Sequence, residues 1–191
     1  MRRAFLAGTA FFLLLVIAAA SAASFDRAVS LPDVLKVKRV AVLPFNNISG
    51  RRDAGEMVAN MFTVEVFKLG RFQVEEPGNI MQFMIQERIN TIGEIDLESM
   101  KRIAERFGVD AVILGTVEEY DDGRSSVPPQ PVVSISARMV EPSTGKIIWS
   151  SQNRRTGKDY VIAFDYGRAR SGAALTKIVV NEMVQTMQEK H

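Results

Sequence analysis

The chain has 191 residues, of which 24 are lysine or arginine, 22 are aspartate or glutamate, one is histidine and none is cysteine. Arg2 and Arg3 belong to a leader, and without them the charges balance at 22 against 22. A balanced chain has no overall field for a polyanion, so we expect no nucleic-acid partner. The missing cysteine excludes disulfides and thiolate-bound metals, and the length left after the leader fits one domain.

The first residues have the pattern of a secretory signal peptide. Arg2 and Arg3 precede an almost wholly apolar run at residues 4–20, and the A-S-A sequence at 20–22 offers a cleavage site. A retained membrane anchor is the alternative, but a spanning helix needs roughly 20 apolar residues. A bacterial lipoprotein signal would also need a cysteine. We therefore predict a signal peptide at 1–22, a periplasmic protein without a lipid anchor, and membrane contact only through the leader before cleavage.

The first half of the remaining chain predicts alternating strands and helices. Residues 23–36 lack periodicity and contain Pro32, so we expect a tether ahead of a domain at 37–190. Apolar spacing then defines each element. The elements are a strand at 37–45, a helix at 53–69 ended by Gly70, a strand at 72–74, a helix at 77–89 that begins at Pro77, and a helix at 96–107 capped by Asp96.

The second half predicts a meander followed by a helix. Its elements are a buried strand at 109–119, strands at 132–140 and 146–152, and a closing helix at 168–190, with Trp149 expected in the core. The order β-α-β-α-α-β-β-β-α predicts an α/β fold that leans toward α+β. We expect a single compact domain with a mixed sheet of about five strands and helices packed against it.

Catalysis and metal binding that depend on histidine or cysteine have no candidate residues in this chain. His191 is the only histidine and also the last residue, where a frayed terminus cannot hold an imidazole against a nucleophile or a metal. Zinc sites need several cysteines or histidines, which are missing. We therefore predict that the protein is not an enzyme and has no catalytic residue, no metal site and no cofactor.

The segment from Gly50 to Gly55 has the glycine spacing of a phosphate-binding loop. Such a loop continues with Lys and Ser or Thr, which hold the terminal phosphates and magnesium, but this chain continues with Glu56 and Met57. A carboxylate at that place would repel phosphate. We expect a turn followed by a helix.

An acidic run at Glu118, Glu119, Asp121 and Asp122 is a candidate calcium site or carboxylate pair for acid–base chemistry. Its spacing matches no EF-hand loop. Glu118 and Glu119 would point to opposite faces of a continuing strand, so they would not converge. A solvated strand end is the favoured interpretation, although an enzyme that uses carboxylates alone stays a minor alternative.

Basic and aromatic residues gather around the last connection of the chain. Arginine and aromatic side chains are enriched where protein interfaces hold most of their binding energy. The candidate partner-binding residues are Arg154, Arg155, Lys158, Tyr160, Phe164, Tyr166, Arg168 and Arg170. The alternative is an ordinary solvated loop whose aromatic rings fold back on the core.

Four stretches of the chain resemble the CsgG-like superfamily of envelope proteins, which includes the curli secretion lipoprotein and the penicillin-binding-protein activator LpoB. They are VAVLPFNNISG (40–50), LGRFQVEE (69–76), IDLESMKRIAERFGVDAVILGTVEEY (95–120) and ARMVEPSTGKIIWSS (137–151). The resemblance implies a periplasmic α/β domain at 37–190, work in envelope assembly or secretion, and no catalytic residues.

Two departures from the superfamily narrow this expectation. Curli-type pore proteins insert a membrane-spanning hairpin where this chain has residues 121–131, and a hairpin needs about 20 residues. The connection here has 11 residues, mostly Pro, Ser, Gly and charged residues, so we expect no pore. The lipid-bearing cysteine is also missing.

We predict a non-enzymatic periplasmic accessory protein that binds a partner in the envelope, either a secretion apparatus or a cell-wall synthase. Two alternatives stay open. One is an LpoB-like activator of a peptidoglycan synthase, and the other is a self-associating ring component of an envelope or appendage complex.

Overall fold

The computed structural model describes residues 25–30, 32–89, 95–162 and 166–188, and every structural statement concerns these ranges. Their elements follow in chain order. They are β1 (Phe25–Ser30), the 3-10 helix η1 (Pro32–Lys36), β2 (Arg39–Val42), β3 (Asn46–Asn47), α1 (Ala54–Lys68), β4 (Gln73–Val74), α2 (Pro77–Gln86), α3 (Leu97–Phe107), β5 (Ala111–Asp121), β6 (Val132–Val140), β7 (Ile147–Thr156) and α4 (Gly172–Gln185).

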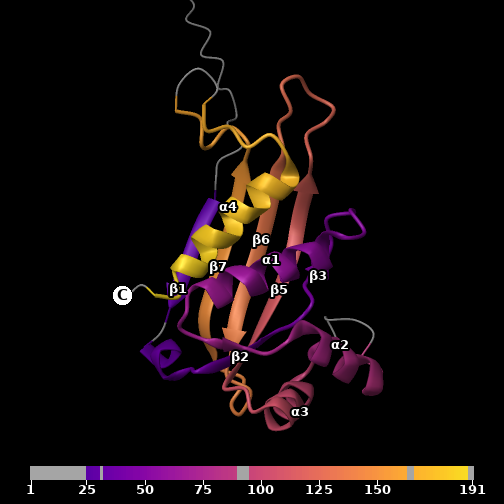
Figure 1. Ribbon diagram of the computed structural model, residues 1–191, viewed down its shortest axis with the longest axis vertical. Coiled ribbons are helices and arrows are strands. Elements are labelled where there is room, and N and C mark those ends of the chain that lie inside the picture. The colour runs from indigo at the N-terminus through magenta and orange to yellow at the C-terminus, as the bar shows by residue number, and fades with distance from the viewer. Residues whose placement is uncertain (1–24, 31, 90–94, 163–165, 189–191) are drawn as a thin grey trace, which may run out of the picture.

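Within the described residues, seven strands form one mixed sheet (Figure 1). The strand order is β1-β7-β6-β5-β2-β4, with β3 beside β5. β2 runs parallel to β4 and β5, whereas β5, β6, β7 and β1 are antiparallel neighbours. The predicted mixed α/β sheet is therefore confirmed, with parallel pairing in the first half and a meander in the second. The predicted strand number was too low by two, because β1 and β3 were not expected.

The helices cover the two faces of the sheet unequally. α1 and α4 lie across one face, while α2 and α3 pack at one end of the other face (Figure 1). Alternate residues along β2 and just after it show this division. Val40 and Val42 belong to the core under α1 and α4, whereas Ala41 and Leu43, the residue that follows β2, belong to the core under α2 and α3. The second face therefore has a helical cover only near β2 and the adjoining end of β5.

The start of α2 and both ends of α3 are where the sequence places them, whereas α2 ends three residues before the predicted position 89 and α4 begins four residues after the predicted 168 and ends five before the predicted 190. Asp96 accepts a hydrogen bond from the Ser99 amide at 2.8 Å, and Gly108 closes α3 with a φ of 61°. Pro77 occupies the first turn of α2. Trp149 lies in the core with 1% of its surface exposed, as predicted.

The expected tether at 23–36 is wrong over most of its length. Residues 25–30 form β1, which pairs with β7 from Phe25 opposite Arg154 to Ser30 opposite Trp149. η1 follows and buries Val34. Backbone pairing to a neighbouring strand holds this segment, so it belongs to the domain. Residues 1–22, where the signal peptide is predicted, lie outside the described residues.

Candidate interaction surfaces

One face of the antiparallel half of the sheet has no helix over it within the described residues. Because strand side chains alternate, apolar residues such as Ile135 face α1 and α4, and polar residues face the other way. We call this second surface the open sheet face. From β5, β6 and β7 it presents Thr116, Glu118, Glu119, Ser134, Ser136, Arg138, Ser150, Gln152 and Arg154, and Val29 of β1 lies on it opposite Ser150. A shallow cavity of about 230 Å³ lies at its centre, between Thr116, Ser136 and Ser150.

A β-bulge brings both glutamates of the acidic run to the open sheet face. The β5–β6 register shifts between Val117 and Glu119, which leaves Glu118 without a partner in the ladder. Glu118 then accepts hydrogen bonds from Ser134 Oγ at 2.7 Å and from Gln152 Nε2 at 3.1 Å. Glu119 pairs with Arg154 Nε at 2.9 Å. The expectation that the two glutamates face opposite ways is wrong, because a bulge interrupts the strand alternation.

The two aspartates of the acidic run hold loops together. Asp121 accepts from the Gly123 amide at 2.7 Å. Asp122 binds the Arg51 guanidinium at 2.7 Å and accepts from the Gly172 amide, at the start of α4, at 3.1 Å. Among the described residues, no group of three or more acidic or histidine side chains is placed to hold a metal ion. His191 lies outside the described residues.

Arg51 also holds the segment from Gly50 to Gly55 in place through its side-chain contacts. Its guanidinium contacts Asp53 at 2.8 Å and lies 4.7 Å from the centre of the Tyr120 ring. A Cβ at Gly55 would lie 2.4 Å from the Phe45 carbonyl oxygen, so this glycine lets α1 begin against the backbone. The segment is a turn before a helix.

The structure separates the first predicted partner-binding residues. β7 extends to Thr156, so Arg154 and Arg155 are neighbours within a strand and point to opposite faces. Arg154 lies on the open sheet face. Arg155 points toward α4 and contacts Glu182 at 2.9 Å. The Tyr160 hydroxyl donates to the same carboxylate at 2.7 Å. Burial, followed by this hydrogen bond, raises the pKa of Tyr160.

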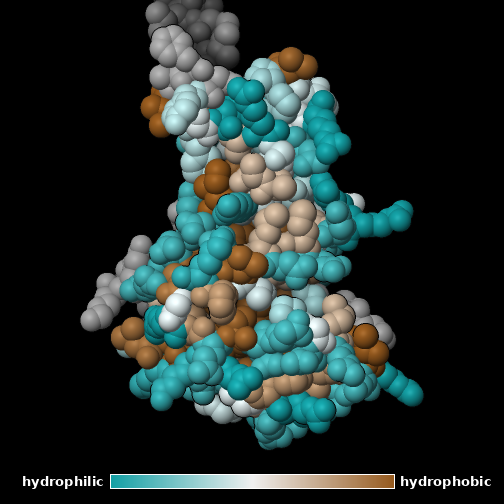
Figure 2. Space-filling view, in the orientation of Figure 1, coloured by the Kyte–Doolittle hydropathy of each residue, from teal (hydrophilic) through white to brown (hydrophobic). Residues whose placement is uncertain are grey.

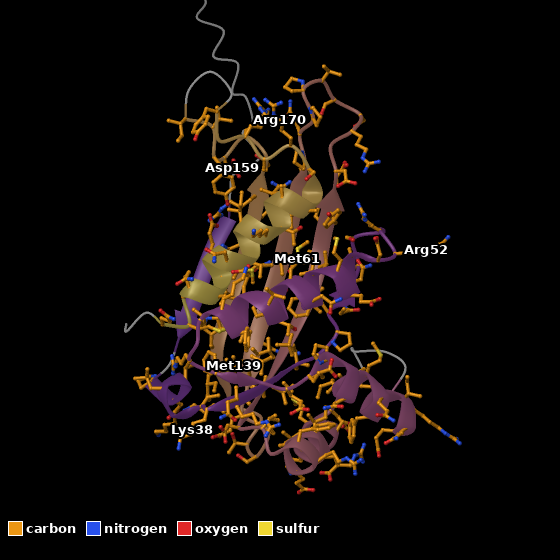
Figure 3. All side chains as sticks on the ribbon, viewed as in Figure 1. Lys38, Arg52, Met61, Met139, Asp159 and Arg170 are labelled. Carbon is orange, nitrogen blue, oxygen red and sulfur yellow. The ribbon has the colours of Figure 1, made fainter. Side chains whose placement is uncertain are left out.

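The rest of that predicted set lies at one end of the molecule. Lys158, Tyr166 and Arg170 are exposed there and Arg168 is half-buried, and Figure 3 shows Arg170 and Asp159 at this end of the molecule. Phe164 lies outside the described residues. The structure therefore does not join the predicted residues into one surface, and their binding role stays a prediction.

Sequence reasoning missed two exposed apolar residues at the same end. Val127, Ile162 and Tyr166 are 99%, 80% and 77% exposed. We call this region the loop end and define it as residues 122–131, 157–162 and 166–171. An apolar residue in a loop normally folds back on the core, as Tyr160 does, so the sequence carries no signal for the exposure of Val127 and Ile162.

None of the helices within the described ranges has the length and apolar character to span a membrane.

No curated protein sequence is significantly similar to the chain. Solved structures share its fold. PelC from Paraburkholderia phytofirmans, crystallised as a dodecamer, is 19% identical, with a TM-score of 0.63 over 88% of this chain and 100% of its own. Lipoprotein GNA1162 from Neisseria meningitidis is 21% identical, with a TM-score of 0.55 over 78% of this chain and 97% of its own.

The LpoB C-terminal domain from Salmonella enterica is more distant. It is 16% identical, with a TM-score of 0.47 over 62% of this chain and 82% of its own. The family model of the GNA1162-like lipoproteins matches residues 35–191, from η1 to the C-terminus. The chain therefore belongs to the GNA1162-like lipoprotein family.

Proposed function

We propose that this protein is a non-enzymatic accessory component of the cell envelope, exported to the periplasm without a lipid anchor, that binds a protein partner through its open sheet face. The observation that carries the proposal is a polar sheet surface without a helical cover in the described chain. Membership of a lipoprotein family and the resemblance to CsgG-like envelope proteins support the location. The partner classes that this resemblance implies are a secretion apparatus and a peptidoglycan synthase.

The open sheet face suits a protein partner better than a small substrate. Its central side chains, Thr116, Ser136 and Ser150, are short and offer donors and acceptors at little entropic cost. They leave room for a partner to approach the sheet closely. Arg138 is exposed beside them, and arginine is enriched among residues that dominate binding energy.

A charge reversal on the open sheet face should weaken partner binding. We expect Arg138→Glu to reduce capture of an envelope protein by a photo-crosslinker at Ser150 about tenfold, which corresponds to about 1.4 kcal/mol. Lys177→Glu is the matched control, because Lys177 is exposed on α4, on the opposite side of the sheet. Cross-linking in cells followed by mass spectrometry measures both. Equal losses in the two variants, or no envelope protein captured at Ser150, would contradict the proposal.

Self-association into a ring is the second candidate function. The observation in its favour is that PelC, which the chain matches over the whole PelC length, was crystallised as a dodecamer. We expect the mass of the purified protein, measured by analytical ultracentrifugation, to be a multiple of the chain mass. A monomer that persists at high concentration would rule out this candidate and leave the first one standing.

A further inference from the structure

The loop end is built from two connections that are tied to each other at their bases. The Gly157 amide, just after β7, donates to the Pro131 carbonyl at 2.9 Å, just before β6. Asp122 accepts from Gly172 across the same region. The second connection, between β7 and α4, is closed farther from its base by the Ile162 amide, which donates to the Tyr166 carbonyl at 2.9 Å. The two loops are therefore joined at their bases, and both lie at the same end of the molecule (Figure 1).

The tips expose apolar side chains that nothing in the described chain covers. Val127 lies on the first loop, and Ile162 and Tyr166 lie on the second. Figure 2 shows apolar surface at this end on both loops. Large apolar residues exposed singly are ordinary, but three at the tips of two joined loops form a candidate docking surface. Tyrosine is also enriched where proteins meet the headgroup layer of a membrane.

Within its described residues, the loop end carries four basic side chains, Arg124, Lys158, Arg168 and Arg170, and two acidic ones, Asp122 and Asp159. Asp159 accepts from the Thr156 amide at 2.7 Å and from its hydroxyl at 3.1 Å. Asp122 is likewise occupied inside the molecule. The Arg124 guanidinium lies 3.4 Å from the Asp122 carboxylate, with 86% of its side chain exposed, and Lys158 is exposed on the second loop. Cations next to exposed apolar residues are complementary to anionic lipid headgroups.

The chain also enters the fold at this end. The first residue of β1, Phe25, lies opposite Arg154, two residues before β7 ends and leads into the second loop. The 24 residues that precede β1 include the apolar run at 4–20. If the leader is retained, which is the alternative to cleavage, it joins the domain at the loop end and not at the α2 and α3 end.

We propose that the loop end docks on a phospholipid surface that contains anionic lipid, with Val127, Ile162 and Tyr166 inserted between the headgroups. This contact is additional to any membrane contact of the leader. It would orient the domain with the long axis of its antiparallel strands pointing away from the membrane, and it leaves the open sheet face accessible to a partner.

Single-cysteine labelling of the full chain tests this docking, because the chain has no cysteine of its own. An environment-sensitive fluorophore is attached to Val127→Cys, to Tyr166→Cys and to the control Ile85→Cys, which is 70% exposed on α2 at the far end. With vesicles of phosphatidylcholine and phosphatidylglycerol, we expect a blue shift and quenching by nitroxide lipids at positions 127 and 166. We expect neither at position 85. Adding Val127→Asp and Ile162→Asp should abolish most of the shift at 166.

Two results would overturn the proposal. If the chain floats with the vesicles while the labels at 127 and 166 stay in water, the leader alone binds the membrane. If these labels shift without vesicles, the loop end is buried against a second copy of the chain. Neither result bears on the open sheet face, so the proposed function is tested separately.

Discussion

Replacing Trp149 by alanine should lower the free energy of unfolding by about 3–5 kcal/mol. The side chain is 1% exposed and packs against Phe62, with ring centres 6.2 Å apart. Its Nε1 donates to Thr186 Oγ1 at 2.9 Å, just after α4. The truncation therefore opens a cavity where β7, α1 and α4 meet and removes the partner of a hydroxyl. For a domain whose total stability is about 5–15 kcal/mol, this is a large fraction.

Two further variants separate the cavity from general effects of mutation. Trp149→Phe keeps an aromatic ring and should lose less than the alanine variant. Phe67→Ala removes a ring that is 69% exposed on α1 and should change the stability by less than about 0.5 kcal/mol. Urea unfolding followed by far-ultraviolet circular dichroism suits all three, because Trp149 is the only tryptophan and its fluorescence is lost in two of them. Similar losses in Trp149→Ala and Phe67→Ala would contradict this account.

The elements that the sequence predicts are those whose own side chains carry a pattern. α3 has an apolar face, an aspartate cap and a closing glycine, and both of its ends lie within a residue of the prediction. β6 alternates apolar and polar residues from Val132 to Val140, and its bounds are the predicted ones. In both cases the local pattern and the tertiary packing require the same residues, so the pattern is sufficient.

The strands that the sequence does not predict, β1 and β3, are held in the sheet by backbone pairing. β1 is an edge strand that pairs only with β7, and its Val29 is exposed, so no apolar pattern marks it. β3 has two residues, too few for any periodicity. The bulge after Val117 depends on how β6 lies beside β5, which the residues of β5 alone do not determine.

The candidate surfaces were harder to predict than the fold. The grouping of Arg154 with Arg155 failed because β7 runs four residues past its predicted end, and a strand sends adjacent side chains to opposite faces. The open sheet face exists because the helices of the described chain do not cover all seven strands on both sides. No single sequence motif indicates this. Recognising it needs the strand order, where β6, β7 and β1 lie on the side of β5 away from β2, and α2 and α3 cover only β2 and the adjoining end of β5.

Substitution of Gly115 in β5 should destabilise the domain about as strongly as truncation of Trp149. The cause is different, because the substitution overpacks the core and does not open a cavity. A Cβ at Gly115 would lie 2.2 Å from Cε2 of the Phe45 ring. That ring is buried and cannot shift easily, because it packs on Phe62 at 5.3 Å, and Phe62 packs in turn on Trp149. Gly115→Ala should therefore destabilise by about 3 kcal/mol through overpacking, although alanine is otherwise better than glycine in a strand.

A double-mutant cycle with Phe45→Leu identifies the cause. Leucine removes the ring edge that meets the new methyl group, so Gly115→Ala should cost less in the Phe45→Leu background than in the wild type, with a coupling energy of about 1–3 kcal/mol. Urea unfolding of the four proteins gives the four stabilities. Additive losses would mean that Gly115 is needed for the backbone of β5 itself. A favourable coupling would instead show that the glycine exists to admit Phe45, which joins the end of β2 to the aromatic packing under α1.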